Sequence, residues 1–204
     1  MRIYIRHAEK QYNNGKSENF GYDPGITEEG KRKAREHAKL LVQQWGIPDI
    51  VVCSPYKRAR ETAIEMISVL DVDRDIKCDI RLSEYLGNHR YDTLNVESET
   101  MQYNPPHPET FFDMQNRVWK HNDDMRELDF DDKVVWFITH GIIINIISNA
   151  MGFKLPRKIP YLGSISFKSQ NNTIESGFYT PQFNMDTKER IQNTNNADNN
   201  FTAS

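Results

Sequence analysis

Four side chains that can hold a phosphoryl group lie next to predicted strands of this 204-residue sequence. Arg6 and His7 follow the first strand, Arg58 lies in the first turns of the helix that follows the second, and His140 follows the fourth. Ligands of open α/β sheets bind beyond the carboxyl ends of the strands, so we expect these groups to converge there. Guanidiniums and imidazoles in one place repel each other unless an anion lies between them, and a guanidinium binds two phosphate oxygens at once. The pattern predicts a phosphate site.

One of the two histidines can also act as a nucleophile, because a neutral imidazole attacks phosphorus and gives a phosphohistidine. The ordinary pKa of histidine is about 6.5, and neighbouring cations lower that pKa, which keeps the attacking nitrogen unprotonated. The leaving alcohol then needs a proton. Glu84, which follows the third predicted strand, is the best-placed acid, since a carboxyl group beside a phosphate dianion holds its proton more tightly.

The elements that position these residues alternate between extended and helical patterns, which favours an α/β fold with a mostly parallel sheet. The extended patterns cover residues 2–5, 50–53, 76–82 and 134–138, and a hairpin is expected over 164–178. The helical patterns begin at Thr27, at Ser54-Pro55, at Glu109 and after Gly141, and they end near Trp45, Leu70, Leu128 and Ala150. Thr27 and Ser54 are of the type that caps a first turn.

Several single residues carry expectations of their own. In the helix predicted from Glu109 to Leu128, the spacing of the apolar residues places Phe112, Val118 and Met125 inward. Three histidines away from the cluster are expected on exposed helices or loops: His37, His89 and His121. Cys53 and Cys78 are expected to be small buried hydrophobic residues.

Composition excludes several classes of protein. With 26 Lys and Arg against 29 Asp and Glu, the net charge is −3, whereas a protein that neutralises nucleic-acid phosphates is usually basic. Two cysteines cannot build a disulfide framework. The apolar stretch 134–153 is interrupted by polar residues and is unsuited to a membrane span, and residues 1–6 do not form a secretory signal. We therefore expect a cytoplasmic protein without nucleic-acid or membrane partners.

A metal site is the alternative use of the same residues, since His7, Glu9, Glu84 and His140 are of the types that bind zinc. The neighbouring arginines would repel a divalent cation, so we expect no metal and no cofactor.

Five segments of the chain, in order, resemble motifs of the histidine phosphatase superfamily, in the branch that includes phosphoglycerate mutase. They are Arg6-His7-Ala8-Glu9 followed by Asn13, Ile26-Thr27-Glu28-Glu29-Gly30, Ser54-Pro55-Tyr56-Lys57-Arg58-Ala59-Arg60-Glu61-Thr62-Ala63, Pro108-Glu109-Thr110-Phe111 with Arg117-Val118, and Thr139-His140-Gly141. The resemblance spans roughly residues 2–168, so a chance match is improbable.

The resemblance implies a three-layer α/β/α sandwich like that of phosphoglycerate mutase. It also implies that His7 is the phosphorylated nucleophile and Glu84 the acid, and that substrate is bound by Arg6, Asn13, Arg58 and His140. The sequence departs from the family pattern at Ala8, where glycine is usual, and in a spacing from Glu84 to Gly87 that is one residue shorter. Glu109 is therefore the next candidate for the acid, with Asp92 behind it.

These observations predict a metal-independent phosphomonoesterase that acts on a small phosphorylated metabolite or a phosphoprotein. A phosphoglycerate mutase-type phosphotransferase and a catalytically inactive phosphate-binding module are the alternatives. We expect one catalytic domain over residues 1–186 and a flexible polar tail over 187–204, because those last 18 residues contain five Asn and few large apolar groups. The oligomeric state and the identity of the phosphomonoester are left open by the sequence.

Overall fold

A computed structural model describes residues 1–11, 23–88, 106–127, 132–170 and 173–181 of the chain. Asn13, Asp92, His89 and the expected tail over 187–204 lie outside these residues. Among the described residues, no helix has both the length and the apolar character needed to cross a membrane.

A six-stranded, mostly parallel sheet forms the middle of the molecule, in the order β3-β2-β4-β1-β5-β6. The pairs β1–β4, β2–β4 and β2–β3 are parallel, whereas β5 and β6 add an antiparallel hairpin at the edge next to β1. The strands are β1 (Arg2–Arg6), β2 (Ile50–Cys53), β3 (Ile76–Cys78), β4 (Val135–Thr139), β5 (Ser164–Gln170) and β6 (Thr173–Tyr179).

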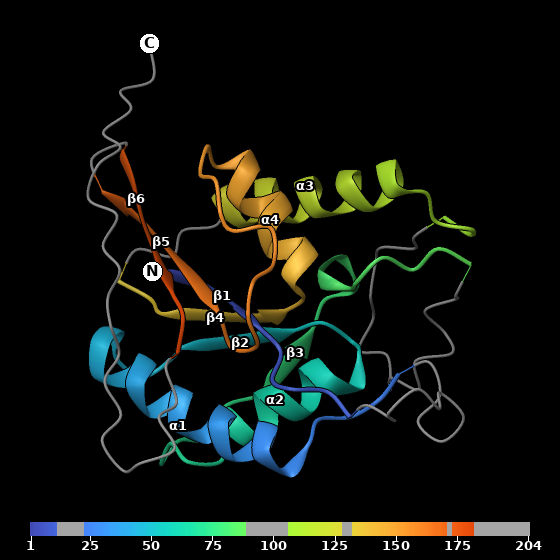
Figure 1. Ribbon diagram of the computed structural model, residues 1–204. Helices are drawn as coiled ribbons and strands as arrows, with labels where there is room; N and C mark the ends of the chain where they lie inside the picture. The colour runs from blue at the N-terminus through green and yellow to red at the C-terminus, as the bar shows by residue number, and fades with distance from the viewer. Residues whose placement is uncertain (12–22, 89–105, 128–131, 171–172, 182–204) are drawn as a thin grey trace.

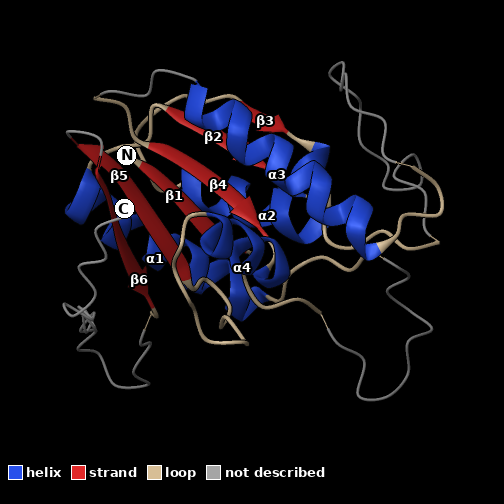
Figure 2. Ribbon diagram, turned by 90° about the horizontal axis from the view of Figure 1, so that it is seen from above, coloured by secondary structure: helices blue, strands red, loops and turns tan. Residues whose placement is uncertain are grey.

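Helices cover both faces of the sheet, which confirms the expected three-layer α/β/α architecture. Figures 1 and 2 show α1 (Glu28–Trp45) and α2 (Lys57–Ile67) on one face and α3 (Phe111–Glu127) and α4 (Gly141–Ala150) on the other. Successive residues of a strand point to opposite faces. Trp136 of β4 accordingly packs in the apolar core under α1 and α2, whereas its neighbour Phe137 packs in the core under α3 and α4.

Helix α1 begins and ends where the sequence predicts. The Thr27 side chain accepts a hydrogen bond from the Gly30 amide at 2.9 Å, which satisfies one of the free donors of the first turn. Gly46 follows the helix with a φ of +88°, a conformation that glycine adopts without steric cost.

Several predicted boundaries differ from the structure, among them the end of α2, which lies at Ile67 and not near Leu70. The strand expected over 76–82 ends at Cys78, because the Asp79 carboxylate accepts from the Arg81 amide at 2.9 Å and starts a short 3₁₀ helix. The helix expected to begin at Ser54-Pro55 begins at Lys57, and the Ser54 side chain has another partner, described below. The helix expected from Glu109 begins at Phe111.

Some predictions of burial were also wrong. Phe112 is 64% exposed instead of facing inward, although Val118 is buried as expected. His37 and His121, expected at the surface, are buried. His121 lies between Asp79, whose carboxylate is 2.9 Å from Nδ1, and the Tyr4 hydroxyl, 3.2 Å from Nε2, so polar partners inside the fold make its burial possible. Cys53 is buried, whereas Cys78 is half-buried.

Candidate active site

Parallel strands bring three of the predicted site segments to one edge of the sheet. Because β2, β4 and β1 are neighbours that run in the same direction, their carboxyl ends meet. The backbone pairing continues past the strands: the His7 amide donates to the Thr139 carbonyl and the Ser54 amide to the Ile138 carbonyl, both at 2.9 Å. His7, Ser54 and His140 are thus fixed side by side at this edge.

The four expected cationic and imidazole residues come together there; we call Arg6, His7, Arg58 and His140 the Arg–His cluster. The rings of His7 and His140 lie 5.2 Å apart between centroids. Each arginine is placed by a tyrosine ring that its guanidinium carbon covers at 4.2 Å, Tyr161 for Arg6 and Tyr56 for Arg58. Tyr161 is 5.7 Å from the His7 ring and Tyr56 is 5.0 Å from the His140 ring, between centroids.

His7 is held in the form that a nucleophile requires. Its Nδ1 lies 2.7 Å from the Ala8 carbonyl oxygen. Because a carbonyl only accepts hydrogen bonds, Nδ1 carries the proton and Nε2 keeps its lone pair. Burial, and next the positive charge of Arg58, hold the pKa of His7 well below its usual value, so the ring is neutral near pH 7.

The Ser54 hydroxyl orients the ring of His140. Its Nε2 lies 2.8 Å from the Ser54 hydroxyl, and that hydroxyl oxygen accepts from the Tyr56 amide at 3.4 Å. When the Ser54 hydroxyl donates to Nε2, the proton of the ring is on Nδ1. Burial, and next Arg58, hold the pKa of His140 well below its usual value. Among the described residues, nothing accepts a hydrogen bond from this buried Nδ1.

Arg58 lies between two carboxylates although its side chain is only 3% exposed. Nη1 donates to Asp23 at 3.2 Å and Nη2 donates to Glu84. Asp23 also accepts from the Lys57 amide at 2.8 Å, which ties it to the start of α2. Burial raises the pKa of Asp23 above its usual value. Two carboxylates thus balance the charge of a buried guanidinium, which is costly without partners.

The two candidate acids differ in their surroundings. Glu84 is 43% exposed, contacts Arg58 and has an oxygen 3.7 Å from Nδ1 of His140. Glu109 is fully buried: Arg117 donates to both of its oxygens, and the Leu86 amide donates to one of them at 2.8 Å. Glu84 thus lies at the Arg–His cluster with access to solvent, whereas the Glu109 carboxylate is used inside the fold.

Comparison with known proteins identifies the family. The model of the histidine phosphatase superfamily (branch 1) matches residues 3–161, more than half of the chain. The chain belongs to this superfamily. No curated protein matches it.

Solved structures share the fold of this histidine phosphatase chain. Ecdysone phosphate phosphatase from Bombix mori, in complex with tungstate, has a TM-score of 0.65 at 17% identity, over 92% of this chain and 96% of its own. SixA from Agrobacterium tumefaciens has a TM-score of 0.58 at 18% identity, over 89% and 97%. The mycobacterial glucosyl-3-phosphoglycerate phosphatase with inorganic phosphate has a TM-score of 0.57 at 19% identity, over 86% and 93%.

Sequence reasoning missed several residues of this histidine phosphatase site. Ser54 was interpreted as a helix cap, but its hydroxyl is the partner of His140. Thr62, one turn after Arg58 on α2, accepts from the Ala8 amide at 3.0 Å and so fixes the chain beside His7. The sequence contains no local signal for Asp23 and Tyr161, because their contacts to Arg58 and Arg6 join segments far apart in the chain.

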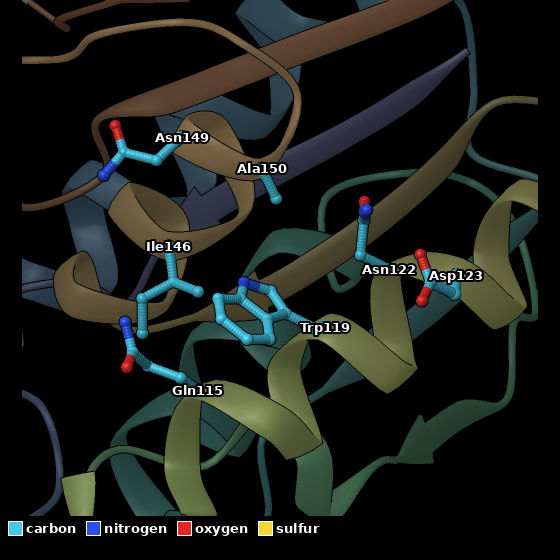
Figure 3. Close-up of a pocket in the computed structure, with 7 residues that line it drawn as sticks. All are labelled: Gln115, Trp119, Asn122, Asp123, Ile146, Asn149 and Ala150. Carbon is cyan, nitrogen blue, oxygen red and sulfur yellow. The ribbon is translucent and has the colours of Figure 1, made fainter. Parts of the chain in front are cut away.

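A pocket of about 420 Å³ lies elsewhere, between α3 and α4 (Figure 3). Its lining contains amides, one carboxylate, the Trp119 ring and aliphatic groups, from Gln115, Trp119, Asn122, Asp123, Ile146, Asn149 and Ala150. No member of the Arg–His cluster and no Lys or Arg is among these lining residues. The pocket therefore has none of the positive charge that a phosphate requires.

Proposed function

We propose that this protein is a metal-independent phosphomonoesterase that works through a phosphohistidine on His7. The observation that carries the proposal is the state of His7: a neutral ring, with Nε2 unprotonated, beside two guanidiniums. This arrangement combines a nucleophile for phosphorus with the charges that hold the phosphoryl oxygens. The same guanidiniums oppose the binding of a divalent cation.

The reaction has two steps. In the first, Nε2 of His7 forms a bond to phosphorus while the bond from phosphorus to the ester oxygen breaks, and the Glu84 carboxyl group gives its proton to the leaving alcohol. In the second, the Glu84 carboxylate takes a proton from water, whose oxygen attacks phosphorus and breaks the bond to His7. Inorganic phosphate leaves, and the enzyme returns to its starting form.

The other members of the Arg–His cluster stabilise the charge on the phosphoryl oxygens, which is the main catalytic task in phosphoryl transfer. Arg6 and Arg58 supply guanidinium donors, and His140 supplies its Nδ1 hydrogen, which has no acceptor among the described residues. Arg58 now donates to Glu84. A bound phosphoryl group takes over this donor and releases the Glu84 carboxyl group to act as the acid. Asn13 stays a predicted substrate contact.

The acid is Glu84 and not Glu109, on the strength of their surroundings. Glu84 lies within 3.7 Å of His140 and is open to solvent, so it can reach both the leaving oxygen and a proton from water. The oxygens of Glu109 are held by Arg117 and the Leu86 amide in the interior.

The substrate is a phosphomonoester of the small-metabolite or phosphoprotein class. Among the structures that share the fold, one is named for glucosyl-3-phosphoglycerate and another for ecdysone phosphate, phosphomonoesters whose alcohol parts differ greatly in size and polarity. The fold is therefore compatible with many alcohols, and a panel of phosphomonoesters is needed to identify the substrate of this protein.

Phosphate release tests the proposal. Purified protein with p-nitrophenyl phosphate should release phosphate at an unchanged rate when EDTA is added, and His7→Ala should lower kcat/KM by about 10⁴-fold or more with an unchanged circular dichroism spectrum. With 3-phosphoglycerate, release of phosphate supports the hydrolase, whereas formation of 2-phosphoglycerate indicates a mutase. A His7→Ala variant with near-normal activity would contradict the proposal, and so would binding of phosphate without turnover.

A further inference from the structure

We infer that Arg117, a buried residue of α3, positions the catalytic acid by holding the backbone of the loop that carries Glu84. The inference rests on the proposed function, since it assigns a positioning role for the acid of that reaction. The loop, residues 83–87, follows the 3₁₀ helix Ile80–Leu82, and we call it the acid loop.

All five N–H groups of the Arg117 guanidinium have acceptors, and three of these are carbonyl oxygens in the first residues of the acid loop and the 3₁₀ helix before it. Nη1 donates to the carbonyls of Arg81 and Ser83, and Nη2 donates to the carbonyl of Glu84 itself, each at 2.8 Å. The remaining two N–H groups donate to the two oxygens of Glu109. One side chain thus binds three carbonyls within four residues.

Glu109 completes the support from the other end of the acid loop. Its Oε2 accepts from the Leu86 amide at 2.8 Å, and its own amide donates to the Gly87 carbonyl at 2.8 Å. The side chains of Arg117 and Glu109 are both 0% exposed. The Arg117–Glu109 pair therefore fixes the loop on both sides of Glu84 while the Glu84 side chain stays partly in solvent.

The pair lies behind the site and not in it. The five Arg117 donors are occupied, so none is left for a substrate oxygen, and Glu109 contacts the loop backbone and Arg117. Loss of the pair should therefore change where the Glu84 carboxyl group stands and leave the nucleophile and the phosphate ligands in place. A displacement of about 1 Å at a catalytic group can cost about 100-fold in rate.

The dependence of kcat/KM on the leaving group distinguishes a positioning role from a merely structural one. Hydrolysis of phenyl phosphate needs the acid, because phenolate is a poor leaving group, whereas 2,4-dinitrophenolate leaves without a proton. We expect Glu84→Gln to lower kcat/KM for phenyl phosphate by about 10²–10⁴-fold with much less effect on 2,4-dinitrophenyl phosphate. Arg117→Lys, which has three donors in place of five, should reproduce this pattern. Its loss of kcat/KM should be at least tenfold greater for phenyl phosphate than for 2,4-dinitrophenyl phosphate.

Val118→Ala is the matched control. Val118 is the next residue of α3, is buried in the core under α3 and α4, and is not part of the site, so its truncation destabilises the same helix. It should lower the thermal midpoint while changing kcat/KM for the two substrates by the same factor. If Arg117→Lys does not fold, Glu109→Gln, which keeps an acceptor for the Leu86 amide, should show the same selective loss.

Suppose that Glu84→Gln shows the expected selective loss of kcat/KM for phenyl phosphate. The inference is then overturned if Arg117→Lys and Glu109→Gln lose kcat/KM equally for the two substrates, or lose none. If Glu84→Gln itself shows no selectivity, the assignment of the acid fails, and the inference with it. If no hydrolysis depends on His7, the proposed function fails.

Discussion

Two buried arginines of this fold differ in their hydrogen-bond partners, and the difference distinguishes a structural arginine from one at the candidate active site. Arg117 and Arg58 have side chains that are 0% and 3% exposed. Every N–H of Arg117 donates to an acceptor inside the fold. Arg58 donates to Asp23 and to Glu84, which is 43% exposed, and its Nε has no acceptor among the described residues.

The two arginines differ in whether a ligand can replace the acceptors of their hydrogen bonds. To remove Arg117 from its acceptors would leave several buried carbonyls unpaired, each at a cost of about 1–3 kcal/mol. In the proposed reaction, a phosphoryl group takes the Nη2 donor of Arg58 from Glu84, whose side chain is 43% exposed. We therefore expect the complete set of partners of Arg117 to stabilise the fold, and the replaceable partner of Arg58 to leave it free to bind a ligand.

Replacement of Arg58 tests the replaceable side of this comparison and should have the largest effect. Arg58→Ala removes a charged donor aimed at the phosphoryl oxygens, so kcat/KM for p-nitrophenyl phosphate should fall about 10²- to 10³-fold. Inhibition by inorganic phosphate should weaken as well. Arg35→Ala, which removes the contact from α1 to Glu65, is the control and should leave both quantities unchanged. Normal phosphate inhibition in Arg58→Ala would contradict the role given to this residue.

The pKa of His37 shows the effect of burial without the effect of the cations in the Arg–His cluster. Burial alone lowers the pKa of His37 to about 4, whereas Arg58 adds to the lowering for His7 and His140. Below the ordinary pKa of about 6.5 the unfolded chain binds a proton that the folded chain refuses. The stability is therefore complete above about pH 6.5 and is lost as the pH falls towards 4.

Urea unfolding at several pH values measures this loss. The free energy of unfolding of the natural chain should decrease between pH 7 and pH 4.5, and His37→Leu should remove about 2 kcal/mol of that decrease. The activity of His37→Leu at pH 7 should stay normal, because His37 is not part of the site. An unchanged pH dependence in this variant would mean that His37 is protonated in the folded state.

Ser54 tests the orientation of His140 and should have the smallest effect. Without the hydroxyl, Nε2 of His140 loses its donor and the ring is free to move its proton from Nδ1 to Nε2. One hydrogen bond of about 1 kcal/mol predicts a five- to tenfold decrease in kcat/KM for Ser54→Ala. Ser68→Ala, at the exposed end of α2, is the control and should behave like the natural protein. An unchanged kcat/KM in Ser54→Ala would show that Ser54 does not set the tautomer.

Local patterns were sufficient to predict an α/β fold with a mostly parallel sheet, whereas its three layers were implied by the family resemblance. Apolar runs such as Val134–Ile138 mark buried strands, and ligands bind beyond the carboxyl ends of such strands, so Arg6, His7 and His140 were expected to converge there. The observed strand order makes β1 and β4 neighbours and so brings these residues together. The Thr27 cap was likewise predicted because a cap acts within one turn.

Long-range contacts account for the errors. The buried positions of His37 and His121 depend on partners such as Ser164, Asp79 and Tyr4, which no local pattern indicates. The choice between Glu84 and Glu109 was open in the sequence for the same reason. A carboxylate is structural when distant donors enclose it, and for Glu109 the donors come from Arg117 and the acid loop.

The proposed reaction requires His7 to carry the phosphoryl group during turnover. Rapid mixing with p-nitrophenyl phosphate, a denaturing quench at alkaline pH and mass spectrometry of the intact and digested protein detect this phosphohistidine. We predict a gain of one phosphoryl group that maps to His7, decays as phosphate appears, and is absent from His7→Ala. A chain that hydrolyses the ester without ever gaining this group, or that carries it on another residue, would contradict the account.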